Sequence, residues 1–275
     1  MQNIESEVNA RFKRWRRLAE ESRAVKKESA TLLEGIHLAQ VVLAHPALVK
    51  AVLLNERQAT AEARDLGNKI SELAKAPLFA LTPALYQALS PVEHGVGLMV
   101  EIALPTLTLG QQKAHLAQAP HALYLDGVQD AGNAGTLIRT AVAAGVKTIV
   151  ASPSSALLWT PKVLRAGMGA HFGATIIENV SAHDFRAQYP GMLLAADARG
   201  GEDLFACTDY PEPTKGVAWI MGAEGPGVSE AALEVSNRRF YIPIEADCES
   251  LNVAAAAAVC MFEQRRRWKT GHSAT

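Results

Sequence analysis

The sequence predicts two α/β domains, the second built on a mostly parallel sheet with helices on both faces. Short apolar runs alternate with helical periodicity along both halves of the chain. Two of these runs, 193–196 and 218–221, are continuously apolar, which is typical of strands buried on both faces. A length of 275 residues with 49% hydrophobic content is enough for two globular cores.

Four segments are expected along the chain. They are a basic N-terminal helix (1–28), a small substrate-binding domain (29–104), a polar linker (105–119) and a larger domain (120–275). In the first half, strands are expected at 31–33, 49–54, 77–80 and 96–102, and helices at 8–28, 35–43, 56–73 and 83–89. In the second half, strands are expected at 122–125, 148–151, 174–177, 192–196, 217–221 and 240–242, and helices at 132–144, 161–166, 229–236 and 250–268.

Composition excludes several classes of protein. The three cysteines lack any CxxC pair, which argues against both a disulfide framework and a structural zinc site, so no metal is expected. No apolar run approaches the roughly 20 residues that span a bilayer, and the polar start lacks the apolar core of a secretory signal. We therefore expect a cytoplasmic protein without a membrane partner.

Positive charge is concentrated at the N-terminus although the whole chain has a net charge of −1. Residues 1–30 contain eight basic and five acidic side chains. Such a segment can bind phosphate groups, but charge alone favours a solvated amphipathic helix.

The first unusual loop, 126–139, has the sequence DGVQDAGNAGTLIR and leads from a strand into a helix. Ligands of open α/β sheets bind at such positions, beyond the carboxyl ends of strands. Asn133 lies near the start of the helix, where capping alone would explain it. Arg139 has apolar neighbours, so a phosphate or carboxylate partner is expected for its guanidinium.

The second loop, GAEGPGVS at 222–229, has three glycines and one carboxylate, Glu224. It lacks the lysine of a P-loop, and Glu224 would repel an anion. A neutral or cationic ligand such as S-adenosylmethionine suits this loop better than a phosphate. Ser229 is predicted to cap the following helix.

The third loop, PIEADCESLNV at 243–253, follows a strand and precedes an alanine-rich helix. Taken alone, Ser250 would be a helix cap. The order and spacing of the three loops change that interpretation.

Together, the three segments resemble the three ordered motifs of the SpoU (TrmH-like) branch of the SPOUT methyltransferases, which methylate the ribose 2′-oxygen of RNA. The resemblance covers 126–262, and KVLRAGMGA at 162–170 resembles the segment between the first two motifs. Upstream, TLLEGIHL at 31–38, LTP at 81–83 and GVGL at 95–98 look like the family's substrate-binding domain, which resembles a ribosomal-protein RNA-binding fold.

This resemblance implies a deep trefoil knot in the second domain, a homodimer, and S-adenosylmethionine as the cofactor. It places Gly222, Ile242 and Leu251 against the cofactor. It also places a catalytic group around the site of transfer, made up of Asn133, Arg139, Glu224, Ser250 and Asn252.

The resemblance also implies a role for each catalytic residue. Arg139 acts either as a general base or as an anchor for the RNA phosphate, and the reluctance of a guanidinium to give up a proton favours the anchor. Asn133, Ser250 and Asn252 supply neutral hydrogen bonds, and Glu224 tethers a loop or lies near the sulfonium.

Three positions depart from the family pattern. Ala131, Ala246 and Ala254 stand where the family often has proline, glycine and serine. A Cβ atom at Ala246 is expected to crowd the cofactor or to change the path of the loop.

Ribosomal RNA is the expected substrate, since the transfer-RNA branch commonly lacks the N-terminal domain. The basic segments Arg11–Lys27 and Arg265–Lys269 are expected to contact backbone phosphates. The alternatives are a transfer-RNA methyltransferase, a non-catalytic RNA-binding protein that retains the fold, and a nucleotide-dependent enzyme that uses the glycine loops for phosphate.

Overall fold

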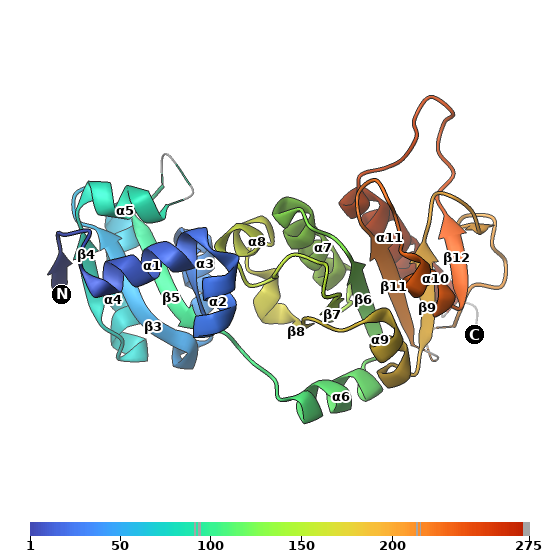
Figure 1. The fold of residues 1–275 in the computed structure, drawn as a ribbon, viewed down its shortest axis with the longest axis horizontal. Coiled ribbons are helices and arrows are strands. Elements are labelled where there is room, and N and C mark those ends of the chain that lie inside the picture. Colours follow the sequence, from blue (N-terminus) through green and yellow to red (C-terminus); the bar gives the residue numbers. More distant parts are fainter. Residues whose placement is uncertain (91, 93–94, 213, 215, 272–275) are drawn as a thin grey trace. The chain divides into compact units, whose positions relative to one another are not determined.

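The computed structural model describes residues 1–90, 92, 95–212, 214 and 216–271. The chain forms two compact units (Figure 1). The first contains Met1–Thr106 together with Trp159–Gly169, and the second contains Leu107–Leu158 together with Ala170–Thr275. The larger predicted domain is therefore not one continuous stretch, since eleven of its residues group with the first unit. None of the described helices has the length and apolar character needed to cross a lipid bilayer.

The first unit contains a mixed five-stranded sheet in the order β1-β4-β3-β5-β2. Strand β5 is antiparallel to β2 and β3, and the other pairs are parallel. Its strands are β1 (Gln2–Ile4), β2 (Ala30–Glu34), β3 (Val49–Asn55), β4 (Leu78–Leu81) and β5 (Leu98–Ala103). Its helices are α1 (Ala10–Glu20), α2 (Ser22–Glu28), α3 (Ile36–Val42), η1 (Pro46–Leu48), α4 (Ala61–Ala74), α5 (Pro83–Leu89) and α8 (Pro161–Ala166).

The single basic helix predicted for the N-terminus is wrong in two respects. Glu21 has extended backbone angles and divides the segment into α1 and α2, and the short strand β1 precedes them. The inner face of α1 is apolar and buried, and Trp15 on this face donates its indole N–H to Glu101 Oε2 of β5 at 2.7 Å. Helix α1 is thus amphipathic and packs on the unit, as its charge pattern favoured.

The second unit contains a seven-stranded sheet in the order β10-β12-β9-β11-β6-β7-β8, in which every pair is parallel. Its strands are β6 (His121–Asp126), β7 (Thr148–Ala151), β8 (Thr175–Ile177), β9 (Met192–Ala196), β10 (Glu202–Asp203), β11 (Val217–Gly222) and β12 (Arg238–Tyr241). Its helices are α6 (Leu109–Gln118), α7 (Ala131–Ala144), η2 (Ala170–Gly173), α9 (Ala182–Gln188), α10 (Glu230–Glu234) and α11 (Val253–Gly271). The predicted mostly parallel sheet is confirmed.

Helices cover both faces of this sheet. On one face, Leu116 of α6 and Phe185 of α9 share a core with Ile220 of β11. The next side chain back along β11, Trp219, points to the opposite face and donates to Gln264 Oε1 of α11 at 2.8 Å. Strand β11 is therefore buried on both sides, as its continuously apolar sequence predicted.

The polar stretch predicted as a linker contains helix α6. Thr108 and Gln111 form a capping box at its start, in which each side chain accepts a hydrogen bond from the other residue's backbone N–H. The Thr-x-x-Gln pattern is visible in the sequence, but the surrounding glycine and glutamines obscured it.

His171 gives the second unit a pH dependence. Its imidazole is 1% exposed and its Nε2 donates to the Leu158 carbonyl at 2.9 Å. Burial outweighs this hydrogen bond and lowers the pKa of His171 to about 4. The unfolded chain, with a histidine pKa of about 6.5, therefore takes up protons first as the pH falls.

We predict that His171 contributes full stability above its unfolded pKa and that this contribution is lost as the pH falls from about 6.5 toward 4, by about 2 kcal/mol at about pH 5. Urea unfolding at neutral and acidic pH measures it. His171→Gln, which keeps a donor for Leu158, should show a smaller loss than the wild type. The control is His183→Gln at a largely exposed position. Equal pH dependence in all three proteins would contradict the assignment.

Candidate active site

A pocket of about 390 Å³ lies at the carboxyl ends of the central strands of the second unit. The parallel register aligns Gly222 with Asp126 and Met221 with Ala196, so the loops that follow β6, β9 and β11 meet at one edge. The pocket is lined by residues from 196–199, 221–227, 240–244 and 250–256. Two of the three predicted loops, the second and the third, line it directly.

The three residues predicted to hold the cofactor, Gly222, Ile242 and Leu251, all line this pocket. Gly222 is also required by the loop itself. A Cβ atom at Gly222 would lie 2.2 Å from the carbonyl carbon of Gly227, where Ala223 and Gly227 form a small antiparallel bridge. A glycine in such a loop also lets a ligand approach the backbone closely. At position 222 the nearer constraint is closure of the loop on its own backbone.

A chain of side-chain hydrogen bonds joins the three predicted motifs. Asn133 donates to the carboxylate of Glu224 and accepts from Asn252 Nδ2 at 3.0 Å. Asn252 in turn accepts from the backbone N–H of Ala254 at 2.9 Å, at the start of α11. Three segments far apart in the sequence are thus held at fixed positions beside the pocket.

Two helix caps differ from the capping interpretations considered from the sequence. The cap of α7 is Asp130, whose carboxylate accepts from the backbone N–H of Asn133 at 2.7 Å, so the Asn133 side chain remains available for Glu224. The start of α11 is capped by Asn252 and not by Ser250. Ser250 is exposed and lines the pocket. Ser229 caps α10, as predicted.

Arg139 does not join the other predicted catalytic residues. It lies on the exposed side of α7 and is absent from the lining of the pocket. Its apolar neighbours Leu137, Ile138 and Ala141 are fully buried on the other side of the helix. Within the described part of the chain, no hydrogen bond or ion pair engages its guanidinium.

The departures from the family pattern do not obstruct the pocket. Ala246 is exposed, lies outside the pocket lining and is not among the residues with positive φ. The expected effect of its Cβ atom on the cofactor stays a prediction. Ala254 is buried, with 5% exposure, in the first turn of α11. Ala131 is the first residue of α7.

Sequence interpretation missed an ionic pair at the pocket. Asp197 follows β9 and its side chain is 1% exposed, while Arg199 donates Nε to Asp197 Oδ1 at 2.9 Å. Burial disfavours ionisation of Asp197, but hydrogen bonds from Arg199 and Arg239 outweigh burial and keep the pKa of this carboxyl below its usual range. The sequence feature that could have identified this pair is the position of Asp197 directly after an apolar strand.

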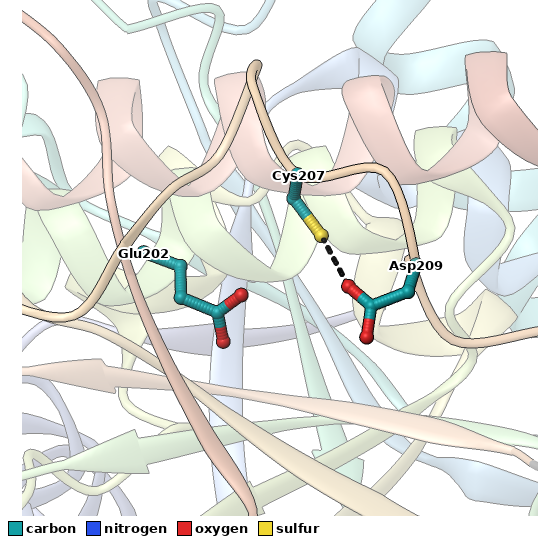
Figure 2. Close-up of side chains that lie close together, drawn as sticks. All are labelled: Glu202, Cys207 and Asp209. Atoms are coloured by element: carbon teal, nitrogen blue, oxygen red, sulfur yellow. Dashed lines mark hydrogen bonds between the residues drawn. The ribbon is translucent and has the colours of Figure 1, made fainter.

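A second group of ligand-type side chains lies outside the pocket. Glu202, Cys207 and Asp209 lie close together (Figure 2). The Arg238 guanidinium already occupies this place, since its Nη2 donates to Asp209 at 3.1 Å, to Cys207 Sγ at 3.3 Å and to Glu202. The cluster is therefore an ion-pair network on the surface.

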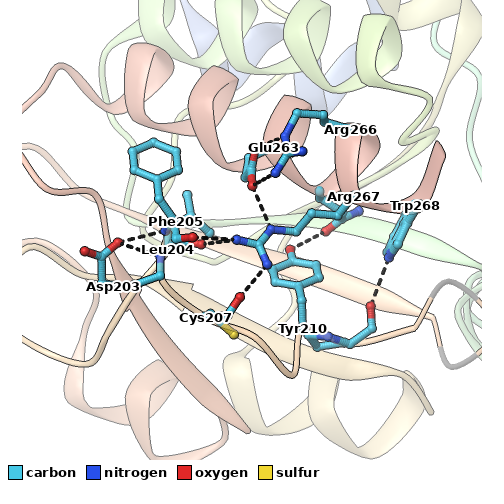
Figure 3. A network of polar contacts seen from close by, with 12 residues as sticks. Asp203, Leu204, Phe205, Cys207, Tyr210, Glu263, Arg266, Arg267 and Trp268 are labelled. Carbon is cyan, nitrogen blue, oxygen red and sulfur yellow. Dashed lines mark hydrogen bonds and ion pairs between the residues drawn. The ribbon is translucent and has the colours of Figure 1, made fainter. Parts of the chain in front are cut away.

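The basic segment Arg265–Lys269 lies in α11, and its arginines form contacts within the second unit. Arg267 donates to the carbonyl oxygens of Leu204, Phe205 and Cys207 at 2.6–3.1 Å and lies over the ring of Tyr210 (Figure 3). Arg265 donates to the Ala144 carbonyl, and Arg266 pairs with Glu263. These three arginines have internal partners, which does not support the expectation that they contact phosphates.

The charges of α1 are partly neutralised in the same way. Arg14 and Arg17 pair with Glu28, and Arg16 pairs with Glu20. These three arginines are therefore less available to RNA phosphates than the charge count alone suggested.

Known proteins share this architecture. The family model described as the SpoU rRNA Methylase family matches residues 120–262. The 23S rRNA (guanosine(2553)-2′-O)-methyltransferase RlmP of Bacillus subtilis is 31% identical over 271 residues, which cover 96% of this chain and 100% of that protein. The 23S rRNA (guanosine-2′-O-)-methyltransferase RlmB of Bordetella pertussis is 33% identical over 148 residues, 53% of this chain and 59% of that protein.

A solved structure agrees in fold. The SpoU methyltransferase AviRb from Streptomyces viridochromogenes, crystallised with S-adenosylmethionine, aligns with a TM-score of 0.80 over 94% of this chain and 98% of its own, at 22% identity. The predicted α/β class is confirmed by this likeness, while the trefoil knot stays a prediction.

We predict that Gly222→Ala lowers the free energy of unfolding by about 3 kcal/mol, because the new methyl group overlaps the backbone at Gly227. Gly225→Ala is the matched control in the same loop. Its Cβ atom meets open space, so the positive φ of 85° alone should cost about 1 kcal/mol. Urea denaturation of both variants compares these losses, and a Gly222→Ala protein as stable as the wild type would refute the loop-closure argument.

Proposed function

Since the chain belongs to the SpoU rRNA methylase family, we propose that it transfers a methyl group from S-adenosylmethionine to a ribose 2′-hydroxyl of ribosomal RNA. The observation that carries this proposal is the hydrogen-bonded chain of Glu224, Asn133 and Asn252 beside the pocket. It joins the three motifs that the resemblance assigned to methyl transfer.

The residues of the pocket fit S-adenosylmethionine. Phe240, Ile242 and Leu251 supply apolar walls suited to adenosine, and Glu224 supplies a carboxylate suited to a sulfonium cation. The described residues that line the pocket include no lysine, which disfavours the alternative of a phosphate-binding nucleotide enzyme. When bound, this cofactor supplies an electrophilic methyl group.

Methyl transfer is an in-line displacement, so the protein's contribution is to position the ribose hydroxyl and exclude competing geometries. Asn133 is fixed at its backbone by Asp130 and at its side chain by Glu224 and Asn252. Glu224 thus tethers the glycine loop to α7. Ser250, exposed on the pocket wall, is placed to hydrogen-bond to an incoming ribose.

We assign Arg139 to the RNA phosphate, because its guanidinium is exposed and its planar fork matches the geometry of a phosphate. Helices α7 and α11 pack together. The exposed surface of α11 includes Ala255 and Phe262, the latter 45% exposed. A second copy of the chain packed on this face would cover both side chains. We infer a homodimer in which Arg139 completes the partner's transfer site, because it lies outside its own pocket.

The cytoplasm is the proposed location, and ribosomal RNA is favoured over transfer RNA. The match to RlmP covers both units of this chain, including the N-terminal one.

We predict that Arg139→Ala lowers methyl transfer at least about a hundredfold while S-adenosylhomocysteine affinity stays within about threefold. Tritiated-methyl incorporation and calorimetry measure these quantities. Arg139→Lys, which keeps the charge but loses the planar fork, should recover only part of the activity. Undiminished turnover in Arg139→Ala would remove Arg139 from the mechanism.

Heterodimers test whether Arg139 acts across subunits. One subunit carries Arg139→Ala and the other Leu251→Asp, which places a charge in the pocket wall. If Arg139 acts across the dimer, one site of the heterodimer is complete and about half the activity returns. If Arg139 acts within its own chain, the heterodimer is inactive. The two parent homodimers should be inactive under both models.

Loss of the gene should remove one or more 2′-O-methyl groups from ribosomal RNA. Mapping of these positions in ribosomal and transfer RNA from cells with and without the gene measures the effect. Loss from transfer RNA alone would support that alternative substrate. Calorimetry with S-adenosylhomocysteine separates the enzyme from a non-catalytic RNA-binding protein, since only the enzyme requires the cofactor.

A further inference from the structure

Arg199 is the one cationic side chain among the described residues that line the pocket. It comes from the loop after β9, outside the three motifs assigned to methyl transfer. The other charged residues of the lining are Asp197 and Glu224. Glu224 accepts a hydrogen bond from Asn133, and Asp197 is buried, so Arg199 presents the accessible positive charge.

The Arg199 side chain is held in place by two groups, the Asp197 carboxylate and the Val228 carbonyl. Its backbone N–H and Nε donate to Asp197 Oδ1 at 3.2 and 2.9 Å, and its Nη2 donates to the Val228 carbonyl at 2.7 Å. The side chain is nevertheless 53% exposed. Within the described residues, no hydrogen bond engages its Nη1, so one edge of the guanidinium remains available.

Asp197 does not cancel this charge. The same carboxylate also accepts a hydrogen bond from Arg239, so two guanidinium groups share one buried anion. The exposed Glu230, outside the pocket lining, offsets part of this charge, so within the lining Arg199 remains the one cationic side chain. An anionic group on the ligand would balance it.

We propose that Arg199 binds the α-carboxylate of S-adenosylmethionine and so helps to select a cofactor that carries an intact amino-acid moiety. The inference rests on the proposed function, because it assumes this cofactor in the pocket. The carboxylate is the only anionic group of S-adenosylmethionine, and the available Nη1 of Arg199 can donate a charge-assisted hydrogen bond to it. Pre-organisation by Asp197 and Val228 reduces the side-chain entropy lost on binding.

The test compares two ligands by calorimetry in the absence of RNA. One is S-adenosylhomocysteine and the other is its decarboxylated analogue, which keeps the amine. The wild type should bind S-adenosylhomocysteine about tenfold more tightly than the analogue, since a charge-assisted hydrogen bond to a half-exposed guanidinium is lost. In Arg199→Ala the two affinities should become equal through weaker binding of S-adenosylhomocysteine alone. Arg199→Lys should keep part of the difference.

Arg239→Ala is the matched control. Arg239 shares Asp197 with Arg199 but does not line the pocket, so the preference for the carboxylate should persist in this variant. If Arg199→Ala weakens the binding of both ligands by the same factor, Arg199 has a purely structural role and the proposal is overturned. An unchanged preference in Arg199→Ala would likewise overturn the proposal. If the wild type binds neither ligand, the proposed cofactor fails together with this inference.

Discussion

The parallel register of β11 between β6 and β9 is the constraint on which the site depends. It places Gly222 beside Asp126 and Met221 beside Ala196, so three strand ends coincide at one edge of the sheet. Apolar burial on both faces of β11 fixes that register, because a shift of one residue would turn Trp219 and Ile220 toward the wrong helices. The geometry of the pocket is therefore set by the core beneath it more than by the loops themselves.

Several side chains at this edge act in both folding and chemistry. Asn252 caps α11 and also donates to Asn133, and Asp130 caps α7 while fixing the backbone of the same asparagine. A helix cap contributes about 1 kcal/mol. Replacement of such a residue changes the stability of a helix and the position of a polar group together, so loss of activity alone would not reveal which function was removed.

Continuous apolar runs made most strands of the second unit predictable from sequence, whereas short polar elements were missed. Strand β10 contains only Glu202 and Asp203, and its pairing with β12 depends on tertiary contacts. The Ser181-x-x-Asp184 cap of α9 was a readable signal that went unused. In the site, Gly222 and Leu251 were identified by motif, but the Asp197–Arg199 pair becomes visible only once the burial of the carboxylate is known.

The contacts of Arg267 have a consequence for variation among related sequences. This side chain donates to main-chain oxygens at positions 204, 205 and 207, and every residue type carries such an oxygen. The three residues can therefore diverge while the path of their segment over α11 is retained. The evolutionary restriction falls on the arginine and on Glu263, which orients it. Among related sequences, the segment 204–207 should therefore vary widely in side-chain type and little in length.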